Sequence, residues 1–345
     1  MRIASLMIFA LALSASAQQP VALRSLLPAA DPLSRQDLTF DASFAQLTVQ
    51  YARTKDPAIL QQLAASPAAA HLLEHARNFD YDVPRDSPQA LVSYLMLKAS
   101  PERIATCQSS LAYFTGPMLT DPHWLNETLE YLPANFRLHG SLFIIFGYDI
   151  GVAYGANSSL NCGHSHFAPH PEELKYYAIH ELHHVGFMSY QPPPRLADLK
   201  TCRDLLKLVE YSTQLEGMAV LAAYNLRRQQ HALNDDEDYV ALQNDARIER
   251  DEKLYLDDLH YLQKRGDQPA DDAAWQVITR MSSGERLWYR VGAHMAQKIE
   301  QSAGRAALVA LIPQGPEKFL AAYQALSTPR GAASPQPAFR PQPQE

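Results

Sequence analysis

The segment His180-Glu181-Leu182-His183-His184 holds the residues of this chain that are best suited to chemistry. It has the pattern H-E-x-x-H, and on a helix the spacing of four places His180 and His184 on one face, one turn apart. Two imidazoles in this arrangement can bind one Zn²⁺ ion, and Glu181 lies about 100° around the helix from His180. A carboxylate there can take the proton from a zinc-activated water, so the pattern predicts metal-assisted hydrolysis.

The residues around this motif predict that a buried helix carries it. Pro171 suits the first position of a helix, and Glu172 and Glu173 suit the positive end of the helix dipole. Apolar side chains then recur on most sides of the helix: Leu174, Tyr177, Ala178, Ile179, Leu182, Val185 and Phe187. Histidine and glutamate side chains on a buried helix need partners, and a metal ion can supply them.

A third protein ligand is expected downstream, because a catalytic zinc usually has three protein ligands and a water. Glu216 is the best candidate, since it lies at the centre of a stretch with helical periodicity over residues 209–224. Gly217 and Ala219 are small enough to let this helix approach the motif helix closely. Glu210 and Asp204 are the alternatives, although Glu210 lies six residues earlier and faces another side of the same helix.

With these residues the chain resembles the gluzincins, zinc peptidases whose ligands are the two motif histidines and a glutamate on a following helix. More narrowly, it is similar to a family of zinc-dependent peptidases that carry H-E-x-H-H and a later E-G-x-A, over residues 138–323 of this chain. The resemblance implies that Zn²⁺ is bound by His180, His184 and Glu216, with Glu181 as the general base and a peptide or protein as the substrate. The 31 residues between His184 and Glu216 (216 − 184 − 1) exceed the spacing in thermolysin-like enzymes.

The resemblance also implies an edge strand and an oxyanion donor. Gluzincins place an antiparallel edge strand beside the metal, where an extended peptide adds as a further strand. The apolar run 141–147 and the segment Gly151–Tyr154 predict a β element, and Gly151–Tyr154 is the expected substrate edge; a plain core hairpin is the alternative. Tyr289 is the expected donor to the oxyanion and His294 the second choice, with a packed core tyrosine as the alternative.

The whole pattern predicts a mainly α fold with a small antiparallel β-sheet (α+β), to which the resemblance adds a gluzincin- or thermolysin-like catalytic core. Helices are expected over residues 44–53, 57–65, 68–76, 88–98 and 104–115, because Pro, Asp and Ser separate these apolar-periodic segments. Longer helices are expected over residues 235–265 and 284–301. His71 and His75 have the spacing of metal ligands, but no acidic residue joins them, so they are expected to be ordinary surface histidines.

One domain is expected over residues 36–326, with a helical part at 36–137 and a catalytic part at 138–326. An irregular segment at 18–35 precedes it, and a disordered, proline-rich tail at 327–345 follows it.

Residues 1–17 have the pattern of a secretory signal: Arg2, then an apolar run, then small residues that suit cleavage. The mature protein is therefore expected to be secreted or periplasmic. The apolar run is too short to span a bilayer, and no later segment is long enough, so no membrane span is expected. The net charge of −7 (30 − 37) becomes −8 without Arg2, and it gives no support to a nucleic-acid partner.

Three cysteines are an odd number for an exported protein. Cys162 and Cys202 flank the motif helix and are the favoured disulfide pair. The alternative is that these two and Cys107 are all small buried thiols.

Three histidines, His164, His166 and His170, precede the motif helix and are expected to form an exposed connector. A second metal site or substrate contact is the alternative. Two other functions remain as alternatives. In one, the chain is an exported zinc-binding or interaction protein in which His164 or His166 closes a structural site. In the other, it is a helical scaffold that binds no metal.

Overall fold

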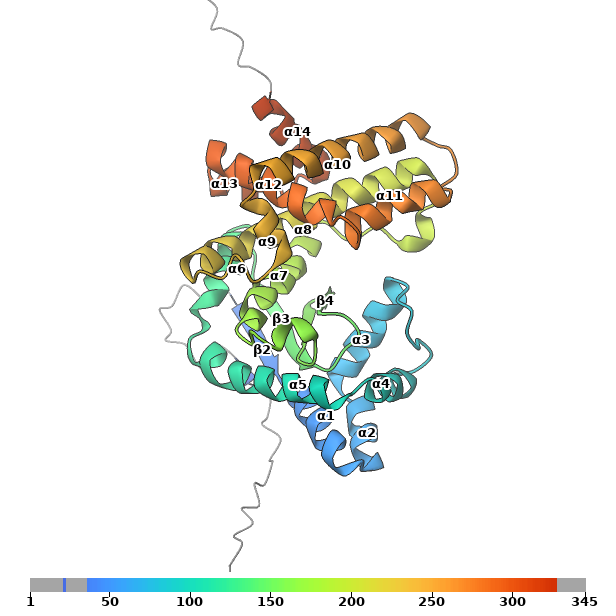
Figure 1. The fold of residues 1–345 in the computed structure, drawn as a ribbon, viewed down its shortest axis with the longest axis vertical. Coiled ribbons are helices and arrows are strands. Elements are labelled where there is room, and N and C mark those ends of the chain that lie inside the picture. Colours follow the sequence, from blue (N-terminus) through green and yellow to red (C-terminus); the bar gives the residue numbers. More distant parts are fainter. Residues whose placement is uncertain (1–20, 23–35, 328–345) are drawn as a thin grey trace, which may run out of the picture. The chain divides into compact units, whose positions relative to one another are not determined.

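A computed structural model describes residues 21–22 and 36–327 of the chain (Figure 1). The predicted signal peptide, most of the segment 18–35 and the tail beyond residue 327 lie outside these residues. Within the described part, the chain divides into two compact units. Unit 1 extends to Leu129 and continues over Asn135–Gly186, and unit 2 comprises Glu130–Ala134 and the chain from Phe187 onward. The units divide the chain at other points than the expected helical and catalytic parts, and the single domain over 36–326 stays a prediction.

The helices of unit 1 follow the expected segments closely. They are α1 (Ser43–Thr54), α2 (Pro57–Ala64), α3 (Pro67–Asn78), α4 (Pro88–Leu97), α5 (Pro101–Tyr113), α6 (Leu125–Glu130, whose last residue belongs to unit 2) and α7 (Glu173–Met188, which continues into unit 2). Four of them begin with the same signal, an Asp or Ser cap followed by proline. The cap side chain accepts a hydrogen bond from a backbone N–H of the first turn in each case: Asp56, Ser66, Ser87 and Ser100.

The sheet of unit 1 is mixed, so the expectation of an antiparallel sheet is wrong. Its strands are β1 (Val21–Ala22), β2 (Gln36–Asp41), β3 (Leu138–Ile145), β4 (Gly151–Tyr154) and β5 (Asn157–Asn161), in the order β1-β2-β3-β5-β4. The pairs β2–β3 and β3–β5 are parallel, whereas β1–β2 and β4–β5 are antiparallel. Helices α1 to α6 form the crossover that lets β2 and β3 run parallel.

Strand β5 has the polar sequence Asn-Ser-Ser-Leu-Asn, which the apolar patterns did not predict. It lies between β3 and β4, so these two strands do not form a hairpin with each other. As a result β4 is the last strand on its side of the sheet among the described residues. The expectation that Gly151–Tyr154 forms an edge strand is confirmed.

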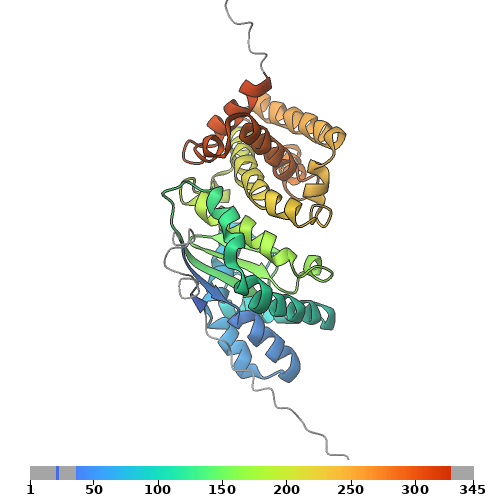
Figure 2. The ribbon, with the colours of Figure 1, turned by 90° about the vertical axis from the view of Figure 1, so that its left-hand side faces the viewer.

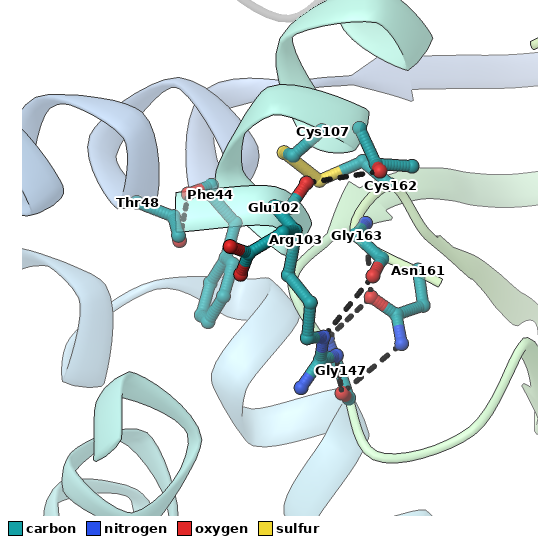
Figure 3. Close-up of a disulfide and its surroundings, with 10 residues drawn as sticks. Phe44, Thr48, Glu102, Arg103, Cys107, Gly147, Asn161, Cys162 and Gly163 are labelled. Atoms are coloured by element: carbon teal, nitrogen blue, oxygen red, sulfur yellow. Dashed lines mark hydrogen bonds between the residues drawn. A yellow bond between two sulfur atoms is a disulfide. The ribbon is translucent and has the colours of Figure 1, made fainter. Parts of the chain in front are cut away.

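The disulfide joins Cys107 on α5 to Cys162, the residue after β5 (Figure 3). Cys202 is a buried free thiol, so the favoured pair Cys162–Cys202 is wrong. The reason is where the fold places Cys107 and Cys202. Cys202 begins the first helix of unit 2 with its Sγ near the Pro269 carbonyl, whereas α5 brings Cys107 to the end of the sheet.

Unit 2 is helical in its described residues. Its helices are α8 (Cys202–Gln229), α9 (Glu237–Leu242), α10 (Asp245–Arg265), α11 (Asp272–Ser282), α12 (Leu287–Ala303), α13 (Arg305–Val309) and α14 (Pro316–Ser327). Helices α8, α10 and α12 pack against one another (Figure 2). The single helix expected over 235–265 is two helices, because the Asn244 side chain caps a new one by accepting from Arg247 N at 3.0 Å. No helix within residues 36–327 is long and apolar enough to cross a bilayer.

Candidate metal and peptide site

The motif residues lie on α7, as expected. The rings of His180 and His184 have centroids 4.4 Å apart, and their ligand nitrogens lie within 4.8 Å of each other. His180 is partly exposed, and His184 and Glu181 are buried. Two imidazole nitrogens at this separation fit neighbouring positions around one Zn²⁺ ion.

Gly151, the first residue of the edge strand, lies directly against the carboxylate of Glu181. A Cβ atom placed on Gly151 would lie 2.5 Å from Glu181 Oε1 and 2.8 Å from its Cδ and Cγ. Glycine is therefore the residue that lets the backbone of β4 approach the carboxylate this closely. The contact brings together the expected base and the expected substrate edge.

The hydrogen-bond pattern of β4 shows which of its backbone groups point away from the sheet. Asn161 N donates to Ile150 O at 2.9 Å, so the backbone of Ile150 points toward β5. In an antiparallel pair this direction alternates along the strand. The N–H and C=O groups of Gly151 and Ala153 therefore point away from β5, to the side of β4 where an added strand would pair.

Helix α3 supports β4, and its two histidines are buried, which corrects the expectation of surface residues. His71 and His75 are 3% and 6% exposed. Burial lowers the pKa of His71 to about 4, although a hydrogen bond with the Val152 backbone partly opposes the shift. Burial, then the charge of His71, lowers the pKa of His75 to about 3. His75 Nδ1 lies 2.9 Å from Tyr148 Oη, in the loop that leads to β4.

Glu216, the expected third ligand, lies on α8 of unit 2 and is partly exposed. The residue after it, Gly217, touches α12 through the backbone: a Cβ on Gly217 would lie 2.2 Å from the carbonyl carbon of Gly292. A Cβ on Gly292 would lie 2.3 Å from Thr213 O on α8. The helix that approaches closely at Gly217 is therefore α12, and the expectation that the motif helix packs at this residue is wrong.

Tyr289 lies one turn before Gly292 on α12, and so beside the face that meets α8. The guanidinium of Arg286 lies over the Tyr289 ring, 3.8 Å from its centroid, and the same guanidinium donates to Asp238 at 2.7 Å. His294 faces elsewhere, with its ring 6.3 Å from that of Tyr323, and burial lowers its pKa. Of the two expected donors, Tyr289 is the one near the contact between α8 and α12.

The rivals of Glu216 have other environments. The carboxylate of Asp204 caps α8, where it accepts from Thr201 N at 2.9 Å and Thr201 Oγ at 2.8 Å, and these hydrogen bonds lower its pKa. Glu210 is half-buried, and burial raises its pKa, with a further contribution from the charge of Glu317. The carboxylate of Asp204 is thus used to cap α8. Glu210, on the same helix as Glu216, remains an alternative third ligand.

The histidine connector before α7 is only partly exposed. His166 Nε2 lies 3.1 Å from Glu173 Oε2, and the Glu173 side chain is buried. His164 Nδ1 accepts from His166 N at 3.3 Å. His170 Nδ1 lies 3.1 Å from Glu172 Oε1 at the start of α7. These contacts organise the entry to the motif helix, and the prediction of a simple exposed connector is wrong for His166.

Comparison with known proteins connects this geometry to a family. No curated protein and no solved structure gives a significant match. A family profile matches residues 121–328, which are 208 (328 − 121 + 1) of the 345 residues. The matched region includes α7, Glu216 and Tyr289. The chain therefore belongs to the family described as "Putative zinc dependent peptidase (DUF5700)".

Proposed function

We propose that the chain is an exported zinc-dependent peptidase of the gluzincin type. The observation that carries this proposal is the contact between Gly151 on the edge strand and the carboxylate of Glu181 on the motif helix. It supplies, within unit 1, a base and a strand edge for an extended peptide at one place.

We assign His180, His184 and Glu216 as the zinc ligands. The two imidazoles have the necessary mutual distance, and Glu216 is the carboxylate on the helix that follows. When bound, zinc lowers the pKa of a water molecule and polarises the carbonyl of the scissile bond.

The residues of the chain then have separate roles. The peptide pairs with the outward backbone groups of Gly151 and Ala153, which holds the scissile bond beside Glu181. Glu181 accepts the proton of the attacking water and later donates it to the leaving amine. The Tyr289 hydroxyl donates a hydrogen bond to the oxyanion, and its position is supported by the stacked Arg286.

Export is part of the proposal and has independent support. The disulfide between Cys107 and Cys162 suits an oxidising compartment outside the cytoplasm. The pattern of residues 1–17 is that of a signal peptide.

The test combines a zinc assay with digestion of a mixed peptide library, read by mass spectrometry. We expect the purified chain to hold zinc and to cleave peptides, and a chelator to abolish cleavage. Glu181→Gln should keep the metal and lose on the order of 10²–10⁴-fold in rate. Glu216→Ala should lose zinc, whereas Glu210→Ala, on the same helix, should retain it.

Full activity of Glu181→Gln would refute the assignment of the base. Unchanged zinc in Glu216→Ala together with loss in Glu210→Ala would move the third ligand to Glu210. A wild-type chain that binds zinc but cleaves no peptide would favour the structural-zinc alternative. In that alternative a fourth side-chain ligand, His164 or His166, closes the site.

A further inference from the structure

The carboxamide of Asn161, at the end of β5, binds the backbone of two loops. Asn161 is fully buried. Its Oδ1 accepts from Gly147 N at 3.0 Å and from Gly163 N at 3.2 Å, and its Nδ2 donates to Gly147 O at 3.1 Å (Figure 3). An amide side chain is needed for this pattern, because one group must accept and donate at the same glycine.

Arg103 on α5 binds the same two loops. Its Nη2 donates to Gly147 O at 3.2 Å and its Nε to Gly163 O at 3.1 Å. The guanidinium also lies over the ring of Phe146, 4.2 Å from the centroid. The disulfide Cys107–Cys162 lies one turn further along α5 and adds a covalent link at the same point (Figure 3).

The loop that these residues hold is the one that leads into the edge strand. Gly147 is the second residue of the loop after β3, and Ile150 is its last. Asn161 binds both of these residues, Gly147 through its side chain and Ile150 through its own backbone N–H at 2.9 Å. The next residue is Gly151, whose backbone touches the Glu181 carboxylate. A shift of the loop would therefore move the edge strand relative to the base.

Gly163 belongs to the second loop, which leads from β5 to α7. The ring of Phe146 packs against Gly163, where a Cβ would lie 2.5 Å from Phe146 Cε2. The same polar groups thus fix the segment before the edge strand and a segment before the motif helix.

We propose that Asn161 is a positioning residue for hydrolysis, assisted by Arg103: it sets the place of β4 against Glu181. The inference rests on the proposed function, since it names a residue that prepares the same site. The side chain of Asn161 makes its hydrogen bonds to the backbone of Gly147 and Gly163, so its proposed effect on hydrolysis acts through the loops.

Asn161→Ala tests the inference, and Asn157→Ala is its matched control. Asn157 is at the opposite end of β5, where its Oδ1 accepts from Ser141 N at 3.0 Å. Both variants lose an asparagine side chain of β5 that binds backbone groups. Only Asn161 binds the loop 147–150. Arg103→Gln serves as a second variant should Asn161→Ala fail to fold.

Two measurements are compared in folded, zinc-loaded protein. Hydrogen exchange of residues 147–154 should be faster in Asn161→Ala and Arg103→Gln than in wild type and Asn157→Ala. The kcat/KM for a cleaved peptide should fall at least about tenfold in the first two variants, with zinc content unchanged. KM should rise as well as kcat fall, because the displaced edge binds the peptide less well.

Equal activity of Asn161→Ala and Asn157→Ala at matched stability would overturn the inference, because it would show a purely structural role. Unchanged exchange of residues 147–154 would overturn it too. If the wild-type chain cleaves no peptide, the proposed function fails, and the exchange experiment still decides whether Asn161 holds the strand.

Discussion

At the scale of single residues, Gly151 decides how close the edge strand comes to Glu181, the proposed base. The motif predicted the position of Glu181 relative to the two histidines, because a helix turns about 100° from each residue to the next. The contact with Gly151 could not be predicted in this way. It depends on the place of β4 beside β5, and β5 was not recognised in the sequence.

Gly151→Ala is expected to impair peptide hydrolysis. The new Cβ would lie 2.5 Å from Glu181 Oε1, so the carboxylate or the strand must shift. We expect kcat/KM to fall roughly 10- to 100-fold, with zinc content unchanged. Gly116→Ala is the control, because a Cβ at Gly116 meets no atom within 4 Å. Wild-type kinetics in Gly151→Ala would contradict the close approach of strand and base.

At the scale of elements, local signals predicted the helices better than the strands. Each Asp-Pro or Ser-Pro pair marks a helix start that needs only its own first turn, so α2 to α5 begin where such a pair stands. The polar strand β5 is held between β3 and β4 by tertiary pairing, which leaves little periodicity in its sequence. The same dependence on neighbours explains the burial of α3, whose histidines resemble surface residues until β4 covers them.

Acid should destabilise the packing of α3 through these histidines. The pKa of His71 is lowered to about 4 and that of His75 to about 3, from an ordinary value of 6.5, mainly by burial. The unfolded chain therefore takes up protons below about pH 6.5 that the folded chain does not. The free energy of unfolding is therefore not reduced by these two histidines above that pH. It decreases as the pH falls below about 6.5, until the histidines of the folded chain also take up protons near pH 4 and pH 3.

Urea unfolding followed by circular dichroism should show this loss between pH 7 and pH 5. We expect a decrease in the free energy of unfolding of about 2 kcal/mol per buried histidine. In His71→Leu the decrease should be about half that of the wild type, whatever the variant's stability at pH 7. An undiminished pH effect in this variant would show that other groups cause it.

At the scale of the whole molecule, the sequence predicted the arrangement of residues within one helix, but not how residues from distant parts of the chain are placed. His180, Glu181 and His184 share one helix, so their arrangement follows from spacing. Glu216 and Tyr289 belong to the other compact unit, and only the packing of long-range elements can place them. The disulfide shows the same limit, because pairing from position in the chain favoured Cys202, while the fold selects Cys107.

The disulfide is expected to stabilise the chain considerably. Cys107 and Cys162 are 55 residues apart, and closing a loop of this length in the unfolded chain corresponds to about 4 kcal/mol as an upper value. A reducing agent should lower the melting temperature of the wild type but not that of the Cys107→Ser, Cys162→Ser double variant. Cys202→Ser, which keeps the bond, should respond to the reductant as the wild type does. Equal melting with and without reductant in the wild type would contradict the bond.

The contact between Gly217 and Gly292 has a consequence for the design of variant libraries. Main-chain atoms, and not interchangeable side chains, set the distance between α8 and α12 at this crossing. Randomised libraries built on this scaffold should therefore keep both glycines and the buried residues beside Glu216 and Tyr289, and vary the exposed positions of the two helices. A library that replaces either glycine would mostly return misassembled clones, and its losses would say nothing about the roles of the varied residues.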